Sequence, residues 1–274
     1  VDVMASGPLV ASLRITRMLN NSKMTQDIVL RRGSRRVDFI TTIDWRERHK
    51  LLKVAFPVDI QADHAVHEIQ FGHICRPNHR SRPFDAERFE VCNHKWTALI
   101  ESNRGCAVLN DCKYGLNVLG KSINLTLLRA PLAPDPIADQ GTQRFTYSYF
   151  AWNGSFSDSD VVRQAYELNC PVLTISGNGG WRSLFTVDMP NIIIETVKPA
   201  EDGSGDVIIR LYESKRMATT CVLTTSLPAT AAAQANMLEE RQRRLKLSRG
   251  RVALAFRPFE IKTIRLVLKA ESKK

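Results

Sequence analysis

The sequence predicts an all-β protein, with a large antiparallel β-sandwich in residues 1–188 and a smaller β-sandwich in residues 189–274. Apolar residues recur at every second position in many short stretches, as expected for strands that place one face on a core and the other in water. Helical patterning is clear in one stretch only, and strands with so few helices between them favour stacked sheets over alternating β/α units. At 274 residues, of which 43% are hydrophobic and 24% charged, the chain can bury a substantial core.

The first part of the chain shows the strand pattern repeatedly. Alternating apolar sets lie at residues 9–15, 37–45, 52–60, 123–127 and 145–151. Before the second of these sets, the segment RRGSRR places Gly33 and Ser34 between arginine pairs, which is typical of a hairpin turn. The pattern therefore predicts neighbouring strands that run antiparallel.

One helix is predicted, in the segment SDSDVVRQAYELN at residues 157–169. Its apolar residues fall on one face, the serines at 157 and 159 are available as caps, and Pro171 ends it. A weaker helical signal lies in the alanine-rich residues 229–241, which contain good helix formers but follow Pro228 and lack an apolar stripe.

A glycine-rich stretch at residues 175–182 marks a shift in composition, and we place the domain boundary shortly after it, near Met189. Beyond the boundary, the strand patterns at 192–197 and 207–211 flank the turn sequence AEDGSGD and predict a hairpin. Two more strands, at 252–256 and 264–268, complete the smaller sandwich.

The net charge of +11 invites a comparison with nucleic-acid-binding proteins, because lysine and arginine attract phosphate. The densest basic run, residues 241–251, contains no aromatic residues that would stack on bases and leads directly into a strand. A solvated basic face is therefore favoured, and no nucleic-acid partner is predicted. No apolar run reaches the 18 residues of a membrane span, so no membrane partner is predicted either.

The chain begins VDVMASGPL, without an initiator methionine, and its strand pattern starts almost at once, which we interpret as a piece cut from a longer protein. No secretory signal is recognisable at this end. The six cysteines contain no CxxC pair and are expected to be reduced, with a disulfide framework as the alternative.

All six histidines fall between His49 and His94, and two groupings suggest themselves around a metal: His64 with His67, or His73 with Cys75 and His79. No paired ligand set with a characteristic spacing accompanies them. Histidines in polar loops and at strand edges are therefore favoured, and no metal ligand is assigned.

The segment RFEVCNHKW, at residues 88–96, is a candidate border of a sugar site. It combines hydrogen-bonding groups with an aromatic face of the kind that suits a sugar ring, in Asn93, His94, Lys95 and Trp96. The alternative is a half-buried strand end, which has a similar composition.

The loop that follows the strand pattern at 123–127 is a second candidate. Its prolines stiffen it and so lower the cost of presenting Arg129, Asp135 and Asp139 to a partner or to a neighbouring site. A rigid connection between strands is an equally good interpretation.

Four segments together carry a family resemblance. They are QFGHICRPNH at 70–79, RFEVCNHKW at 88–96, AVLNDCKYG at 107–115 and LLRAPLAPDPIADQG at 127–141. In this order they resemble the C-terminal part of the α-mannosidases of glycoside hydrolase family 38, of the cytosolic, metal-dependent kind, and the similarity extends over nearly the whole chain.

The resemblance implies a galactose-mutarotase-like supersandwich followed by a terminal sandwich, preceded in the complete enzyme by a catalytic barrel that carries an aspartate nucleophile and a divalent metal, zinc or cobalt. That enzyme removes terminal α-linked mannose from oligosaccharides with retention. None of the barrel's ligands or catalytic carboxylates has a counterpart here, so no residue of this chain is assigned a catalytic or metal-binding role, and no cofactor is expected in it.

From the resemblance we expect a non-catalytic part of a cytoplasmic glycosidase, inactive alone, that braces the missing N-terminal catalytic domain and borders its cleft. Its other partner would be a mannose-containing oligosaccharide, reached through the parent enzyme, and a homo-oligomer is left open. The alternative from another class is a free-standing carbohydrate-binding β-sandwich. Serine-hydrolase and nucleotide chemistry lack support, because the sequence has no GxSxG, P-loop or GxGxxG motif.

Overall fold

The computed structural model describes residues 1–177, 180 and 183–269, and the chain divides into two compact units, Val1–Leu173 and Thr174–Lys274. The glycine-rich stretch expected near the boundary lies partly outside the described residues. The second unit already includes the strand β14 (Phe185–Val187), because β14 pairs with a later strand of that unit. The division of the structure thus falls before Met189.

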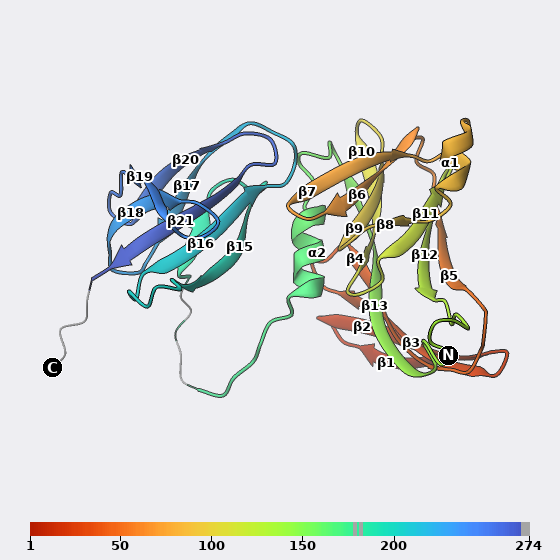
Figure 1. The fold of residues 1–274 in the computed structure, drawn as a ribbon. Coiled ribbons are helices and arrows are strands. Elements are labelled where there is room, and N and C mark those ends of the chain that lie inside the picture. The colour runs from red at the N-terminus through yellow and green to blue at the C-terminus, as the bar shows by residue number, and fades with distance from the viewer. Residues whose placement is uncertain (178–179, 181–182, 270–274) are drawn as a thin grey trace. The chain divides into compact units, whose positions relative to one another are not determined.

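Unit 1 is built on a nine-stranded sheet in which every neighbouring pair is antiparallel (Figure 1). In spatial order its strands are β1 (Asp2–Ser6), β2 (Val10–Leu19), β3 (Ser22–Arg31), β4 (Arg36–Trp45), β13 (Gly141–Asn153), β10 (Arg104–Asn110), β9 (Trp96–Ile100), β6 (His64–Ile69) and β7 (Gly72–Pro77). The β3–β4 hairpin closes through Gly33, whose φ of 75° explains why glycine is needed in that turn.

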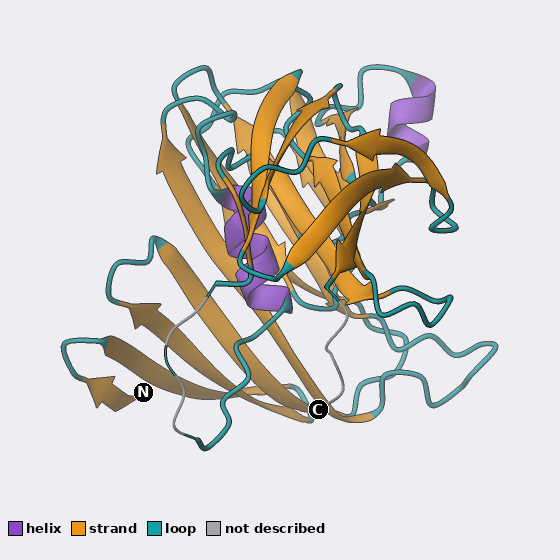
Figure 2. Ribbon diagram, turned by 90° about the vertical axis from the view of Figure 1, so that its left-hand side faces the viewer, coloured by secondary structure: helices purple, strands orange, loops and turns teal. Residues whose placement is uncertain are grey.

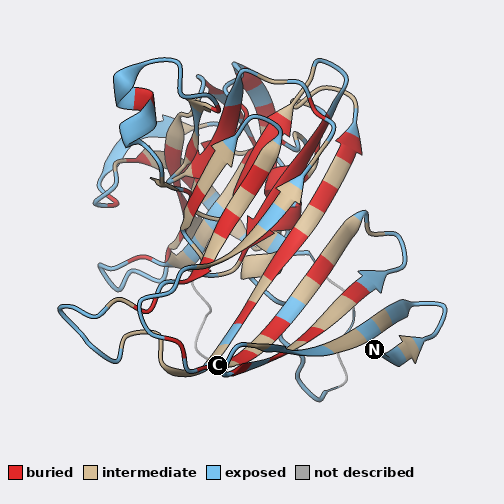
Figure 3. Ribbon diagram, turned by 90° about the vertical axis from the view of Figure 1, so that its right-hand side faces the viewer, coloured by how far each residue is buried: buried red, intermediate tan, exposed pale blue. Residues whose placement is uncertain are grey.

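A second, four-stranded sheet covers part of the first. Its order is β5 (Leu52–Pro57), β12 (Ser122–Leu128), β11 (Gly115–Leu119) and β8 (Val91–Cys92). Residues of both sheets form one core cluster, including Ile43 and Leu99 from the large sheet with Leu116, Ile123 and Leu125 from the small one. Buried and less buried residues alternate along the strands (Figure 3), as the apolar periodicity predicts.

The predicted helix is confirmed as α2 (Val161–Asn169), which lies against β9 and β10 (Figure 2) and buries its apolar face. Its cap differs from the expected serines: the N-cap residue is Asp160, whose carboxylate makes no capping hydrogen bond. That carboxylate instead pairs with Arg35 and Arg163, each at 2.9 Å. A short second helix, α1 (Pro83–Glu87), has proline in its first turn.

Unit 2 is a smaller sandwich of two antiparallel sheets. One has the order β14, β17 (Thr219–Thr225) and β20 (Arg251–Phe256), and the other has the order β15 (Ile192–Pro199), β16 (Val207–Glu213), β21 (Ile261–Leu268), β18 (Ala229–Ala235) and β19 (Arg241–Leu245). Both sheets contribute to one apolar cluster. The predicted all-β architecture is thus confirmed in both units.

The helix suggested by the weak signal at residues 229–241 is wrong, because this stretch forms the strand β18, the turn after it and the first residue of β19. β18 lies between β21 and β19, so both sides of its backbone are hydrogen-bonded. Ala232 and Ala235 fill narrow buried positions on it. Sheet pairing of this extent outweighs the few tenths of a kcal/mol per residue by which alanine favours a helix.

All six cysteines carry free thiols, in agreement with the reduced state that the sequence predicts. Cys106 and Cys221 are buried, and burial raises the pKa of each thiol to about 11. None of the helices in the described part of the chain has the length and apolar character required to cross a bilayer.

Candidate functional site

The segment 88–96 connects the two sheets of unit 1. β8, within it, pairs with β11 at the edge of the small sheet, and Trp96, at its end, begins β9 of the large sheet. The residues between these strands, Asn93 to Lys95, therefore cross from one sheet to the other at one end of the sandwich.

Asn93 is fully buried and holds this crossing in place. Its backbone N–H and its Nδ2 both donate to the Tyr114 carbonyl, at 2.9 and 3.1 Å, and its Oδ1 accepts from Asn110 Nδ2 at 3.1 Å. Asn110 also donates to the His94 carbonyl at 2.7 Å. The side chain of Asn93 thus supports the segment from inside.

His94 and Lys95 are half-buried, and the structure uses them differently. The Lys95 ammonium donates to Glu68 Oε1 at 3.0 Å and lies 4.5 Å from the centre of the Tyr166 ring, so its charge is already compensated. His94 meets the exposed Tyr114 ring edge-on at 5.4 Å and contacts Gln70 at 3.3 Å between the two Nε2 atoms. The outward part of this site is therefore His94 with Tyr114 and Gln70.

Tyr114 and Gln70 were missed as site residues, although both lie in segments that the family resemblance singles out. Tyr114 precedes Gly115 in AVLNDCKYG, and Gln70 opens QFGHICRPNH. Only the pairing of β8 with β11 and of β6 with β9 brings these two segments to His94.

Trp96 is only 1% exposed, which differs from the surface aromatic that a sugar-facing role requires. Its ring packs against His73 and Phe156, with centroid distances of 6.1 and 5.7 Å. Its position in β9 explains the burial, since that strand lies between β10 and β6 and its first four residues, on both faces, are buried. In unit 1 the ring contributes to packing.

The proline-rich loop at 129–141 is closed by its own carboxylates. Asp139 Oδ2 accepts the backbone N–H groups of Arg129 and Ala130, at 2.8 and 2.9 Å, and Asp135 Oδ1 accepts that of Ile137 at 3.0 Å. The Arg129 side chain is exposed and lines an open hollow of about 490 Å³. Both aspartates thus shape the loop, and Arg129 is the candidate that points outward.

The sheet topology brings the two candidate segments to one end of the small sheet. β8 and β12 both pair antiparallel with β11, so the segment after β8 and the loop after β12 leave from the same end of the sheet, with β11 between their strands. The described residues include no hydrogen bond or ion pair that joins Asn93–Trp96 to the loop. His94 and Arg129 therefore follow strands that end at the same end of the small sheet, and no hydrogen bond joins them.

Glu90 links four segments on the outer face of the small sheet. Its Oε2 accepts from Thr126 Oγ1 at 3.0 Å, its Oε1 pairs with Lys53, and Lys53 also donates to Asn117 Oδ1 at 2.5 Å. Asp111 accepts the Thr146 N–H at 2.8 Å. Glu90 and Asp111 thus each bind neighbouring strands, and the two carboxylates do not share a partner.

The histidine groupings considered for a metal do not assemble into one. Throughout residues 1–177, 180 and 183–269, no three His, Cys, Asp or Glu side chains gather closely enough to hold an ion. His67 is buried and its Nδ1 lies 3.0 Å from Thr97 Oγ1. The described residues therefore do not provide a ligand set that fits the divalent metal that the resemblance expects in the catalytic domain.

Comparison with known proteins identifies the family. Residues 1–137 match the model described as the glycosyl hydrolases family 38 C-terminal domain, and residues 191–264 match the family 38 C-terminal beta sandwich domain. The chain belongs to glycosyl hydrolase family 38. The prediction from its sequence segments is confirmed.

The family 38 chain is 42% identical over 257 residues to Alpha-mannosidase 2C1 of Homo sapiens and 41% identical over 259 residues to that of Mus musculus. It is 34% identical over 257 residues to Alpha-mannosidase of Saccharomyces cerevisiae. The matches cover 84–91% of this chain but 24–25% of those relatives, so the chain spans about a quarter of their length. The fold is similar to that of an alpha-mannosidase from Enterococcus faecalis V583, with a TM-score of 0.78 at 20% identity over 96% of this chain and 34% of that one.

We expect the stability of unit 1 to depend on the protonation of His67. Burial lowers the pKa of His67 from 6.5 to about 3, and the charge of Arg76 adds to this effect. Between these values the unfolded chain binds a proton that the folded chain does not, so the free energy of unfolding falls as pH falls, by up to about 1.4 kcal/mol per pH unit. Hydrogen exchange in β6 and β9 between pH 6.5 and 4 measures this slope.

The variant His67→Gln should flatten the slope, whereas the control His49→Gln, at an exposed histidine, should leave it unchanged. Equal slopes in the parent chain and in His67→Gln would contradict the assignment.

Proposed function

We propose that this chain is the non-catalytic C-terminal part of an α-mannosidase, a retaining glycosidase that removes terminal α-linked mannose from oligosaccharides. One observation carries the proposal. Sequence identity of 41–42% extends over about 90% of this chain, and it falls on only a quarter of relatives that are named as α-mannosidases.

The arrangement of carboxylates in this chain supports the proposal that hydrolysis takes place in another part of the complete polypeptide. Retaining hydrolysis requires two carboxyl groups about 5–5.5 Å apart at the scissile bond. Of five cavities formed by the described residues, one is lined by a single carboxylate, that of Asp85, and another by that of Asp59. The other three are lined by no carboxylate. The zinc or cobalt ion would likewise be held by the catalytic domain, since the residues present here do not fit it.

We assign to this chain the role of bracing the catalytic barrel and bordering its cleft, with the end of the small sheet as the bordering surface. His94, Tyr114 and Gln70 form a half-exposed group of hydrogen-bonding and aromatic side chains there, and Arg129 leaves from the same end. Side chains of these types bind sugar hydroxyls and sugar faces. A cytoplasmic location belongs to the same proposal and rests on the resemblance to the cytosolic enzymes.

The test is a hydrolysis assay with an aryl α-mannoside in the presence of zinc or cobalt. The 274-residue chain, freed of any longer polypeptide, should give no turnover, because none of the five cavities described above is lined by two carboxylates. A longer polypeptide that includes the upstream region should hydrolyse the substrate under the same conditions. Turnover by the 274-residue chain at a rate that survives repeated purification would contradict the proposal.

The His94–Tyr114–Gln70 group also favours a second function, that of a free-standing carbohydrate-binding β-sandwich. Calorimetry with mannose and with oligomannose distinguishes the two. The first proposal expects little or no heat from the chain alone, whereas the second expects saturable binding that Tyr114→Ala removes.

A further inference from the structure

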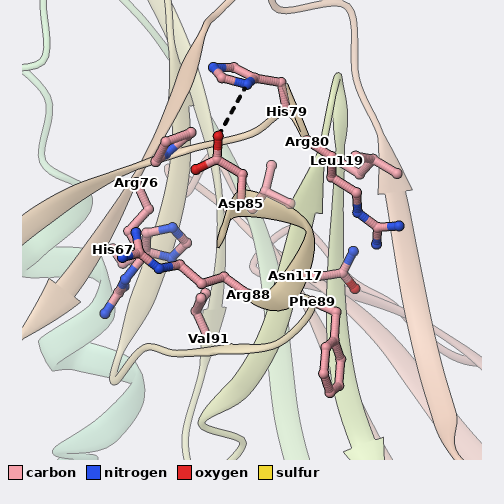
Figure 4. A pocket seen from close by; sticks show the side chains of 12 residues that line it. His67, Arg76, His79, Arg80, Asp85, Arg88, Phe89, Val91, Asn117 and Leu119 are labelled. Carbon is pink, nitrogen blue, oxygen red and sulfur yellow. Dashed lines mark ion pairs between the residues drawn. The ribbon is translucent and has the colours of Figure 1, made fainter. Parts of the chain in front are cut away.

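A small cavity in unit 1 lies beneath α1 and is bordered by β6, β7, β8 and β11 (Figure 4). Its volume is about 30 Å³, which exceeds the roughly 10–15 Å³ that one water molecule needs. It is far smaller than the ~300 Å³ or more of pockets for drug-sized ligands. The cavity thus fits a small ion better than a sugar ring.

The lining of this cavity is strongly basic. Arg76, Arg80 and Arg88 all line it, and in the described part of the chain none of the three forms an ion pair. The one carboxylate, that of Asp85, is already held by Arg82 through two contacts of 2.8 and 3.0 Å. The lining therefore contains three guanidinium groups that are not paired with a carboxylate, beside the Asp85–Arg82 pair.

The neutral polar groups of the lining are oriented as donors as well. Asn117 Oδ1 accepts from Lys53, which leaves the Nδ2 group free to donate into the cavity. His67 is 1% exposed and its Nδ1 lies 3.0 Å from Thr97 Oγ1, so Nε2 is the ring nitrogen that remains for a ligand in the cavity. A ligand that accepts hydrogen bonds could use both of these groups.

Arg76 is fixed in position for such a ligand. Its Nη1 donates to the Cys92 carbonyl at 3.0 Å and its Nη2 contacts Cys92 Sγ at 3.8 Å, which anchors the guanidinium while several of its five N–H groups remain for a ligand. In Figure 4, Arg76, Arg88 and His67 occupy one side of the cavity, and Arg80 and Asn117 occupy the other. Basic side chains thus line the cavity on two sides.

We propose that this cavity binds a small tetrahedral oxyanion of the phosphate or sulfate class, through Arg76, Arg80 and Arg88. Planar guanidinium groups match such oxygens in pairs, and their permanent charge offsets that of the ion. The site does not depend on the proposed function, because none of its residues belongs to the surface assigned to the mannosidase cleft.

The test is isothermal titration of the 274-residue chain with inorganic phosphate at low and high sodium chloride concentrations. We expect saturable binding with one site per chain, weakened by salt. Arg80→Gln and Arg88→Gln should each lower the affinity about tenfold, as expected for the loss of a charge-assisted hydrogen bond. Arg32→Gln is the matched control, since it removes one exposed arginine that does not line the cavity, and it should leave the affinity unchanged.

A second readout locates the ion. Phosphate should shift the ring ¹⁵N resonances of His67 and leave those of the exposed His49 unchanged. Absence of saturable binding at millimolar phosphate would overturn the proposal. So would an equal loss in Arg32→Gln, which indicates attraction by net charge alone, or equally tight binding of acetate, which indicates a carboxylate site.

Discussion

The variant Glu213→Gln is expected to destabilise unit 2 by about 3 kcal/mol. Glu213 is fully buried at the end of β16, and its carboxylate accepts four hydrogen bonds. Oε1 accepts from Asn191 Nδ2 at 2.9 Å and from the Lys215 N–H at 2.7 Å. Oε2 accepts from the N–H groups of Met217 and Phe259, at 3.0 and 3.1 Å.

Glutamine retains the shape of this side chain but replaces one acceptor oxygen with an NH₂ group. That group would then face two donors in a buried site, which leaves both without an acceptor. The carboxylate joins the turn after β16 to the turn before β21, so the effect should extend to both strands.

Hydrogen exchange is the appropriate measurement, because it resolves unit 2 from unit 1. Protection in β16 and β21 should fall, while that of β10 and β13 should stay unchanged. The control Glu201→Gln, at a largely exposed glutamate, should lie within about 0.5 kcal/mol of the parent chain. Parent-like protection in Glu213→Gln would show that the four hydrogen bonds contribute little.

The variant Gly105→Ala is expected to destabilise unit 1 by about 2–3 kcal/mol. Gly105 lies in β10 directly opposite Trp152 of β13, and a Cβ atom there would lie 2.2 Å from Trp152 Cζ2. Trp152 is 3% exposed and stacks on Phe150 with a centroid distance of 5.9 Å, so it has little room to move. Overpacking of a well-filled site costs free energy through strained rotamers and backbone shifts.

Urea unfolding followed by hydrogen exchange in β10 and β13 measures this effect. Gly7→Ala is the matched control, because its Cβ would meet nothing closer than the Val10 carbonyl oxygen at 3.8 Å. If the collision with Trp152 is the cause, the double variant Gly105→Ala, Trp152→Leu should be more stable than the sum of the single effects predicts. Additive effects would show that the destabilisation by Gly105→Ala does not arise from contact with Trp152.

Periodicity alone predicted most of the strands, because a strand that meets a core on one face must alternate. The sets at 37–45 and 145–151 became β4 and β13, and α2 followed from its 3.6-residue pattern. The helix suggested for residues 229–241 was wrong. Alanine favours a helix locally, but in the folded protein β18 pairs with the neighbouring strands β21 and β19.

The candidate site was predictable only in part. The segment 88–96 was recognised, but composition does not reveal that Asn93 and Trp96 point inward whereas His94 points outward. The aspartates of the loop at 129–141 looked available in the sequence, yet Asp139 binds the backbone of its own loop. Arg80 and Arg88 gave no signal at all, because a basic cavity forms only when α1 closes over β7 and β11.

The sequence by itself determined the family, the all-β class and most strand positions, since these depend on local periodicity and on the order of a few segments that resemble the family. The tertiary structure decided which side chains are buried, which carboxylates are engaged, and which arginines meet around one cavity. Those properties depend on strand pairing between residues distant in sequence, and such pairing assigns each side chain a face and a neighbour that its own segment does not encode.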